Sequence, residues 1–118
     1  MADRSSTEMS DRQYLDLLQA HGMYGIVHYS DEVSTHPFLL GWLLDEEPDQ
    51  EGVSPEQVKA HLAALRSSET LHPAILSLSE GFFSDGQYSY VPQALNGNRE
   101  AYRSYMEGCD VAAFTRIR

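Results

Sequence analysis

Short apolar runs alternate with amphipathic stretches along this chain. The apolar runs have the length of buried strands, and the amphipathic stretches repeat apolar residues every three or four positions, as one face of a helix does. Strands are therefore predicted at residues 23–29, 38–45, 74–79 and 111–117, and helices at residues 11–21, 55–66 and 99–107. This alternation predicts an α/β fold with parallel strands and outer helices.

Two of the predicted helices begin with complete capping signals. Ser10 precedes the first helix and Gln13 stands at its third position, while Ser54, Pro55 and Gln57 repeat the pattern at the second. In each case the serine and the glutamine satisfy backbone N–H groups that have no partner inside the helix. The signals therefore fix the predicted helix starts.

The length limits the chain to one domain at most, since it has 118 residues. Residues 10–118 are predicted to form a single α/β domain, and residues 1–9 a disordered polar tail. A Ser-Asp-Gly sequence between two aromatic pairs predicts a hairpin within residues 81–92. For residues 38–45, a short helix that starts at Pro37 is the alternative to a strand.

The strand predicted at residues 38–45 ends in an acidic cluster, Asp45-Glu46-Glu47-Pro48. In βα folds the chemistry lies where the strands end. Proline restricts the residue before it, which suits a carboxylate that must point in one direction. The alternative interpretation is a solvated acidic loop over residues 45–51.

Side chains alternate between the two faces of a strand, so this cluster is predicted to divide between them. Glu47 falls on the face that points away from the helices. With it are Gly41, Leu43 and Asp45, whereas Leu40, Trp42, Leu44 and Glu46 fall on the helix-facing side.

The sequence HPFLLGWLLDEEP at residues 36–48 resembles the fourth βα unit of TIM-barrel glycoside hydrolases, in which HPALLGWYLADEP-like sequences close the fourth strand. In that family the glutamate of the Asn/Asp-Glu-Pro triplet is the general acid/base, and it aligns with Glu47. Weaker similarity to neighbouring strands extends over residues 11–118. The resemblance implies a partial (β/α) barrel that acts on a carbohydrate, without a cofactor or a metal ion.

The chain also departs from the pattern of this family. Glu46 stands where the family has Asn or Asp, and Thr115, Ile117 and Arg118 replace the Asp, Tyr and Pro that close the sixth strand. The connection over residues 30–37 is shorter than a parallel crossover normally needs. The family's nucleophile lies on the seventh strand, and the chain stops at the sixth. We therefore expect a barrel fragment that is inactive alone and that self-associates or binds a missing barrel half.

Four further residues are predicted to contact substrate: Glu46, His28, Glu80 and Trp42. Glu80 follows the strand at residues 74–79 and would face Glu47 across the barrel mouth, although capping a turn is its ordinary role. His28 ends an earlier strand and is otherwise a packed or rim histidine. The five histidines show no metal-ligand spacing such as HExxH, so no metal site is predicted.

Negative charge is concentrated in the first half of the chain, within a formal net charge of −10. Residues 13–58 contain nine carboxylates and neither lysine nor arginine, whereas four of the seven arginines lie in the last twenty residues. Such a surface repels phosphates, so direct nucleic-acid binding is not expected. The alternative function is an acidic α/β protein-binding module, such as an inhibitor or a DNA mimic.

Cysteine usage and hydropathy exclude several kinds of site and segment. Cys109 is the single cysteine, so an internal disulfide and a cysteine-based zinc site are excluded. No apolar run approaches 18 residues and no GxGxxG, Walker or GxSxG sequence occurs, so neither a membrane span nor a cofactor is predicted. As encoded, the product is expected in the cytoplasm; an upstream gene start would remove that expectation.

Overall fold

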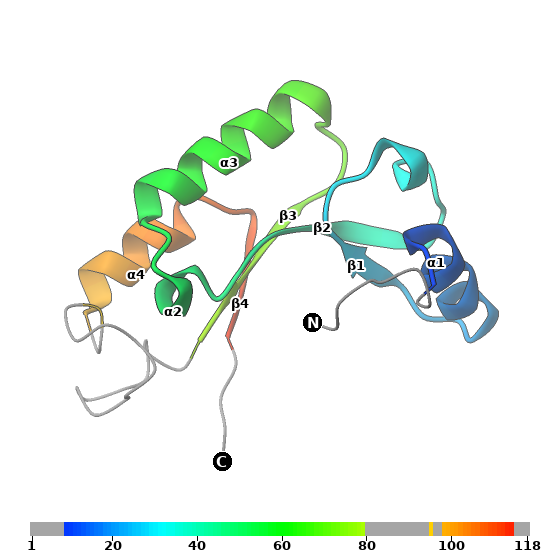
Figure 1. The fold of residues 1–118 in the computed structure, drawn as a ribbon, viewed down its shortest axis with the longest axis horizontal. Coiled ribbons are helices and arrows are strands. Elements are labelled where there is room, and N and C mark those ends of the chain that lie inside the picture. Colours follow the sequence, from blue (N-terminus) through cyan, green and yellow to red (C-terminus); the bar gives the residue numbers. More distant parts are fainter. Residues whose placement is uncertain (1–8, 80–94, 96–97, 115–118) are drawn as a thin grey trace, which may run out of the picture.

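The computed structural model describes residues 9–79, 95 and 98–114, so the predicted hairpin lies outside the described residues, as do residues 1–8 of the predicted tail (Figure 1). In chain order the elements are α1 (Asp11–Ala20), β1 (Gly25–Val27), the 3₁₀ helix η1 (Asp31–Val33), β2 (Leu39–Glu46), α2 (Pro48–Glu51), α3 (Pro55–Ser68), β3 (Ala74–Leu78), α4 (Arg99–Met106) and β4 (Val111–Phe114). The α/β class is confirmed, and the run predicted as a strand at residues 38–45 is a strand over Leu39–Glu46, not a helix.

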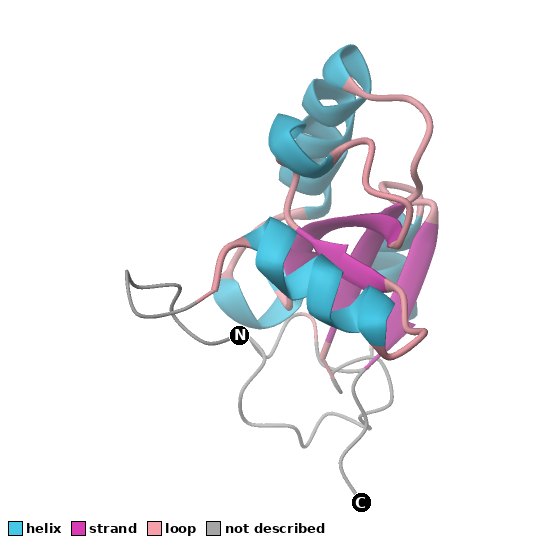
Figure 2. Ribbon diagram, turned by 90° about the vertical axis from the view of Figure 1, so that its right-hand side faces the viewer, coloured by secondary structure: helices cyan, strands magenta, loops and turns pink. Residues whose placement is uncertain are grey.

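The four strands form one sheet in the order β1-β2-β3-β4, and every neighbouring pair is parallel. The prediction that β2, β3 and β4 are parallel neighbours is therefore confirmed. Helices α3 and α4 lie together on one side of this sheet (Figures 1 and 2). Val58 of α3 and Tyr102 of α4 share a buried cluster with Leu76 and Leu78 of β3, so both helices cover the same face.

Both capping boxes form as the sequence predicts. The Ser10 hydroxyl accepts a hydrogen bond from the Gln13 N–H at 3.2 Å, and the Gln13 side-chain oxygen accepts one from the Ser10 N–H at 2.8 Å. Ser54 and Gln57 repeat this pair at 3.1 and 2.8 Å. Local chemistry therefore sets where α1 and α3 begin.

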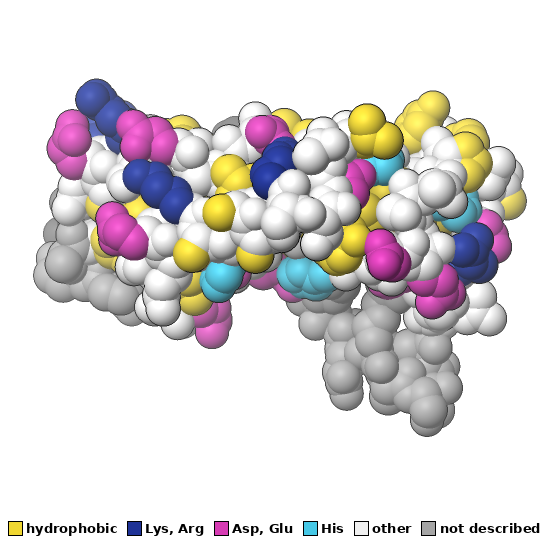
Figure 3. Space-filling model, turned by 90° about the horizontal axis from the view of Figure 1, so that it is seen from above, with side chains coloured by type: hydrophobic (Ala, Val, Ile, Leu, Met, Phe, Trp, Pro, Cys, Tyr) yellow, Lys and Arg dark blue, Asp and Glu magenta, His cyan; other side chains and the backbone are white. Residues whose placement is uncertain are grey.

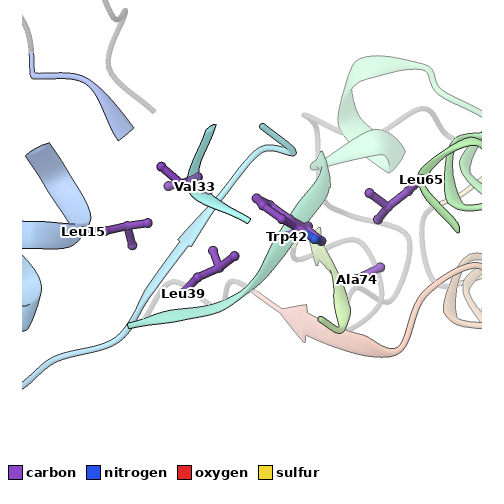
Figure 4. Close-up of a cluster of buried hydrophobic side chains, with 7 residues drawn as sticks. Leu15, Val33, Leu39, Trp42, Leu65 and Ala74 are labelled. Atoms are coloured by element: carbon purple, nitrogen blue, oxygen red, sulfur yellow. The ribbon is translucent and has the colours of Figure 1, made fainter. Parts of the chain in front are cut away.

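A second buried cluster joins α1 and α3 to the first half of the sheet (Figure 4). Trp42 is its largest member and is fully buried. Its other buried members come from six elements and are Leu15, Val27, Val33, Leu39, Leu65 and Ala74. Because α1, η1 and α3 all pack on this face, the helical layer covers one side of the sheet from end to end.

Glu69 and His72 form a hydrogen-bonded pair at the edge of this cluster, beside Trp42. Glu69 accepts hydrogen bonds from the backbone and the side chain of His72, and the His72 ring meets the indole edge-on at 5.6 Å between ring centroids. Burial by itself raises the pKa of the Glu69 carboxyl, but the His72 hydrogen bonds and the nearby indole outweigh burial and leave that pKa lowered. Glu69 is therefore held as a carboxylate at the edge of the core.

The connection from β1 to β2 contains a 3₁₀ helix and no α-helix. The parallel pair forms nevertheless, with Gly25 opposite Leu39 and Ile26 opposite Gly41, so β2 carries one extra residue there. That bulge moves Leu39 into the core and leaves Leu40 half exposed. The predicted place of Leu40 on the helix-facing side is therefore wrong.

Leu76 and Leu71 offer a matched test of this packing. Leu76 is fully buried beneath α3 and α4, whereas the Leu71 side chain is 88% exposed. We expect Leu76→Ala to lower the free energy of unfolding by about 2–5 kcal/mol and Leu71→Ala by less than about 0.5 kcal/mol. Urea denaturation of both variants measures the difference, and similar losses would contradict the described helix-covered face.

Candidate functional site at the carboxyl end of the sheet

A second bulge in β2 determines which acidic side chains reach which face. Leu43 lies opposite Ile75 and Asp45 lies opposite Leu76, so one extra residue separates the two pairs. Asp45 thereby turns to the helix side, where its Oδ2 lies 2.9 Å from Nδ1 of His61 on α3. The predicted face of Asp45 is wrong, because a slip of one residue reverses every side chain beyond it.

The same slip places Glu46 on the face without helices. It lies opposite Ser77 of β3, and its Oε2 is 3.4 Å from Nε2 of His28. The prediction had put Glu46 on the helix-facing side, and this too is corrected. Glu46 and His28 therefore meet at the carboxyl ends of β1 and β2, as the strand-tip prediction requires.

The His28 ring has a defined orientation. Nδ1 lies 2.9 Å from the carbonyl oxygen of Leu43, which only accepts hydrogen bonds, so Nδ1 carries a proton and donates it. Nε2 then faces the Glu46 carboxylate. The side chains are 52% and 41% exposed, so both can reach a ligand. Together they can share a proton or accept hydrogen bonds from a hydroxyl group.

Glu47 follows directly and adopts a left-handed backbone, with φ 48° and ψ 53°. Its N–H donates to the Ser77 carbonyl at 2.6 Å, and its own carbonyl accepts from the N–H of Gln50 at 2.9 Å. The chain thus passes from β2 into α2 within one residue. Pro48–Glu51 is a short helix, which replaces part of the acidic loop considered as the alternative.

Asp49 is a buried polar centre that the sequence did not single out, because it lies inside a run of acidic residues. Its carboxylate accepts hydrogen bonds from the Ser79 hydroxyl at 2.5 Å, from the Ser79 N–H at 3.2 Å and from the Tyr102 hydroxyl. These bonds join α2 to the end of β3 and to α4. Burial and then the bond to Asp49 raise the pKa of Tyr102 far above its usual value.

The structure separates the candidate residues into three groups. His28, Glu46 and Glu47 lie at adjoining strand ends. Trp42 is buried in the core, so its side chain has no surface to offer a substrate. Glu80 lies outside the described residues.

The described residues contain neither a cluster of metal ligands nor a helix suited to a membrane. No three His, Cys, Asp or Glu side chains gather there as a metal ion would need. Within the same residues, none of the helices combines the length and the apolar character that crossing a bilayer takes.

Comparison with known proteins adds no family to this description. No protein-family model matches the chain, and no significant match exists among curated proteins or solved structures. The functional argument therefore depends on the geometry of the carboxyl end of the sheet.

The buried tyrosines beside Asp49 predict a loss of stability in alkali. Burial, followed by the charges of Asp49 and Glu56, raises the pKa of Tyr105 from 10.0 to about 12. The unfolded chain loses this proton first, so the stabilisation is complete below pH 10 and disappears as the pH rises towards 12. In urea denaturation at increasing pH, Tyr105→Phe should lose stability less steeply than the parent protein. Tyr24→Phe, at an exposed site, should follow the parent, and identical slopes for all three proteins would contradict the assignment.

Proposed function

We propose that this chain is part of a carbohydrate-hydrolysing (β/α) barrel, in which a glutamate at the end of β2 acts as the general acid/base. The observation that supports this most directly is the position of Glu46 and Glu47 at the carboxyl end of a parallel strand, beside His28 of the neighbouring strand. In (β/α) barrels the catalytic residues occupy strand ends on this side.

The strand order supports the barrel part of the proposal. Strands β1 to β4 follow each other across the sheet in chain order. When parallel crossovers all progress in one direction and share one hand, their helices fall on a single side. Here α1, α3 and α4 pack on one face, through the two buried clusters, and the other face carries no described helix. A barrel wall has this arrangement.

The two adjacent glutamates are proposed to have different roles. Glu47 donates the proton to the leaving oxygen, and its backbone, tied to Ser77 and to α2, holds it in place. Glu46 and His28 accept hydrogen bonds from sugar hydroxyls at the adjoining strand ends. Double displacement also needs a nucleophilic carboxylate about 5–5.5 Å from the acid, and another segment must supply it.

The alternative, an acidic protein-binding module, requires a continuous array of exposed carboxylates. The β2–α2 segment does not present one: Asp49 is fully buried and Asp45 is bound to His61, with only 18% of its side chain exposed. Glu46 and Glu51 remain exposed, on different elements. The described geometry therefore favours the carbohydrate proposal over a mimic of nucleic-acid charge.

Ligand binding tests the proposed site without requiring catalysis. We expect β-linked oligosaccharides to shift the NMR signals of the His28 ring, and Glu46→Gln to weaken binding about tenfold through the loss of a charge-assisted hydrogen bond. Glu51→Gln is the matched control, because Glu51 is exposed on α2 and lies outside the cluster. Shifts elsewhere, or equal effects of both variants, would overturn the proposed site.

Catalysis tests the role of Glu47. The chain alone is expected to be inactive, and hydrolysis should appear when the rest of the barrel is supplied. In that complex, Glu47→Gln should reduce the rate about 10²–10⁴-fold for natural glycosides, since they need a proton donor. An activated aryl glycoside needs no proton in the first step and should lose far less. Equal losses with both substrates would exclude Glu47 as the acid.

A further inference from the structure

The described sheet has two outer strands, β1 and β4. Within the described residues β1 pairs only with β2, and β4 pairs only with β3. Each outer strand therefore presents backbone N–H and C=O groups that a further strand could pair with. Ile26 on β1 is 36% exposed and Val111 on β4 is 46% exposed, so apolar side chains accompany both edges.

The face opposite the helices is also apolar. Residues opposite each other in the register share a face, and this face carries Ile26, Gly41, Leu43, Ile75, Ser77, Val111 and Ala113, with the exposed carboxylate of Glu46 at its carboxyl end. Parallel sheets occur almost only with both faces covered, yet the described helices cover one. Ile75 is only 6% exposed and packs over Gly41, where a Cβ atom would lie 2.9 Å from Ile75. The centre of this face is therefore already buried, whereas Ile26 and Val111 at its two borders are exposed.

We propose that a second copy of this chain completes the sheet, with β4 of each copy pairing with β1 of the other around a two-fold axis parallel to the strands. The proposed dimer goes beyond the proposed function, and it rests on that function only for what the candidate site does. A rotation about that axis keeps every strand parallel and pairs both edges at once. Four strands from each copy make eight, the number at which side chains fill a parallel barrel.

The one-sided helical layer makes this closure possible. The helices of both copies would remain outside, and the apolar faces would meet inside. A single added peptide strand would pair one edge and leave the other edge and the apolar face open. A second copy is therefore the occupant that pairs both outer strands and also covers the apolar face.

Charge at the two edges agrees with this pairing. Helix α1 beside β1 carries two aspartates and one arginine, whereas α4 beside β4 carries two arginines and one glutamate. Across the new joint α4 would lie next to α1 of the other copy, and opposite net charges would face each other. The side chains of Asp16 and Arg103 are 60% and 72% exposed, although Asp16 already contacts His36 and Arg103 already contacts Glu100 within the chain.

Exposed apolar side chains are concentrated at the β1 edge. In Figure 3 hydrophobic side chains gather at the end of the molecule where Figure 1 shows α1 and β1. Met23, Tyr24, Ile26 and Leu40 are all more than one third exposed there. A joint at this edge would bury them, which favours association by the hydrophobic effect.

Closure would also bring the two copies of the candidate site to one end of the barrel. Strand β2 of one copy would stand directly across the barrel from β2 of the other, because four strands separate them in a ring of eight. The His28–Glu46 pair and Glu47 of both copies would then border one opening.

Sedimentation velocity over a wide range of concentrations, followed by cross-linking, tests the proposal. We expect a reversible dimer that Val111→Lys weakens at least about tenfold, because the joint would bury the added charge. Leu71→Lys is the matched control, since Leu71 is the most exposed large apolar residue among those that the structure describes and lies outside the sheet, and it should leave association unchanged. A monomer at every concentration would overturn the proposal.

Cross-linking identifies which edges meet. In a Cys109→Ser background, chains with Ile26→Cys are mixed with chains carrying Ala113→Cys and treated with a short thiol-to-thiol linker. The mixture should give cross-linked dimers, and each variant alone should give almost none. Efficient linking within either variant alone would show that like edges meet, and would overturn the head-to-tail closure.

The two proposals fail separately. A dimer whose chains cross-link as expected but which binds no oligosaccharide would retain the closed sheet and remove the carbohydrate function. A monomer that binds oligosaccharide at His28 and Glu46 would retain the site and remove the second copy.

Discussion

Strand β2 sets the arrangement of the whole sheet because it is paired on both sides and carries an extra residue in each pairing. The extra residue against β1 brings Leu39 and Trp42 together in the core, and the extra residue against β3 sends Asp45 to the helices and Glu46 to the opposite face. With one bulge fewer, the ionisable groups at the strand end would exchange faces. The core and the candidate site are thus fixed by the same strand.

The sequence predicted the features that depend on neighbours along the chain. Helix starts follow from Ser10 and Ser54, and the strands follow from short apolar runs, because capping and side-chain periodicity are local properties. The β2 bulges could not be predicted, since they depend on how β1 and β3 align with it. For the same reason the sequence placed Glu46 on the wrong face while placing it correctly at the end of the strand.

Asp49 illustrates a second limit of reading a sequence alone. In the chain it is one acidic residue among several, yet in the fold it is the acceptor for Ser79 and Tyr102, which approach from β3 and α4. Burial of a carboxylate is tolerated when donors surround it, and the loss of a donor is then costly. The network holds α2 against the sheet and so stabilises the backbone that carries Glu47.

The left-handed backbone conformation of Glu47 lowers the folding stability at a position that keeps a carboxylate side chain. Glycine adopts that backbone without steric cost and asparagine tolerates it, whereas glutamate adopts it with strain. A chain shaped only by folding stability would carry glycine or asparagine there. Glutamate instead retains a carboxylate at the cost of a less favourable backbone, a compromise that proteins make where a side chain has work to perform. Substitution by glycine would then give a more stable fold that lacks the proposed proton donor.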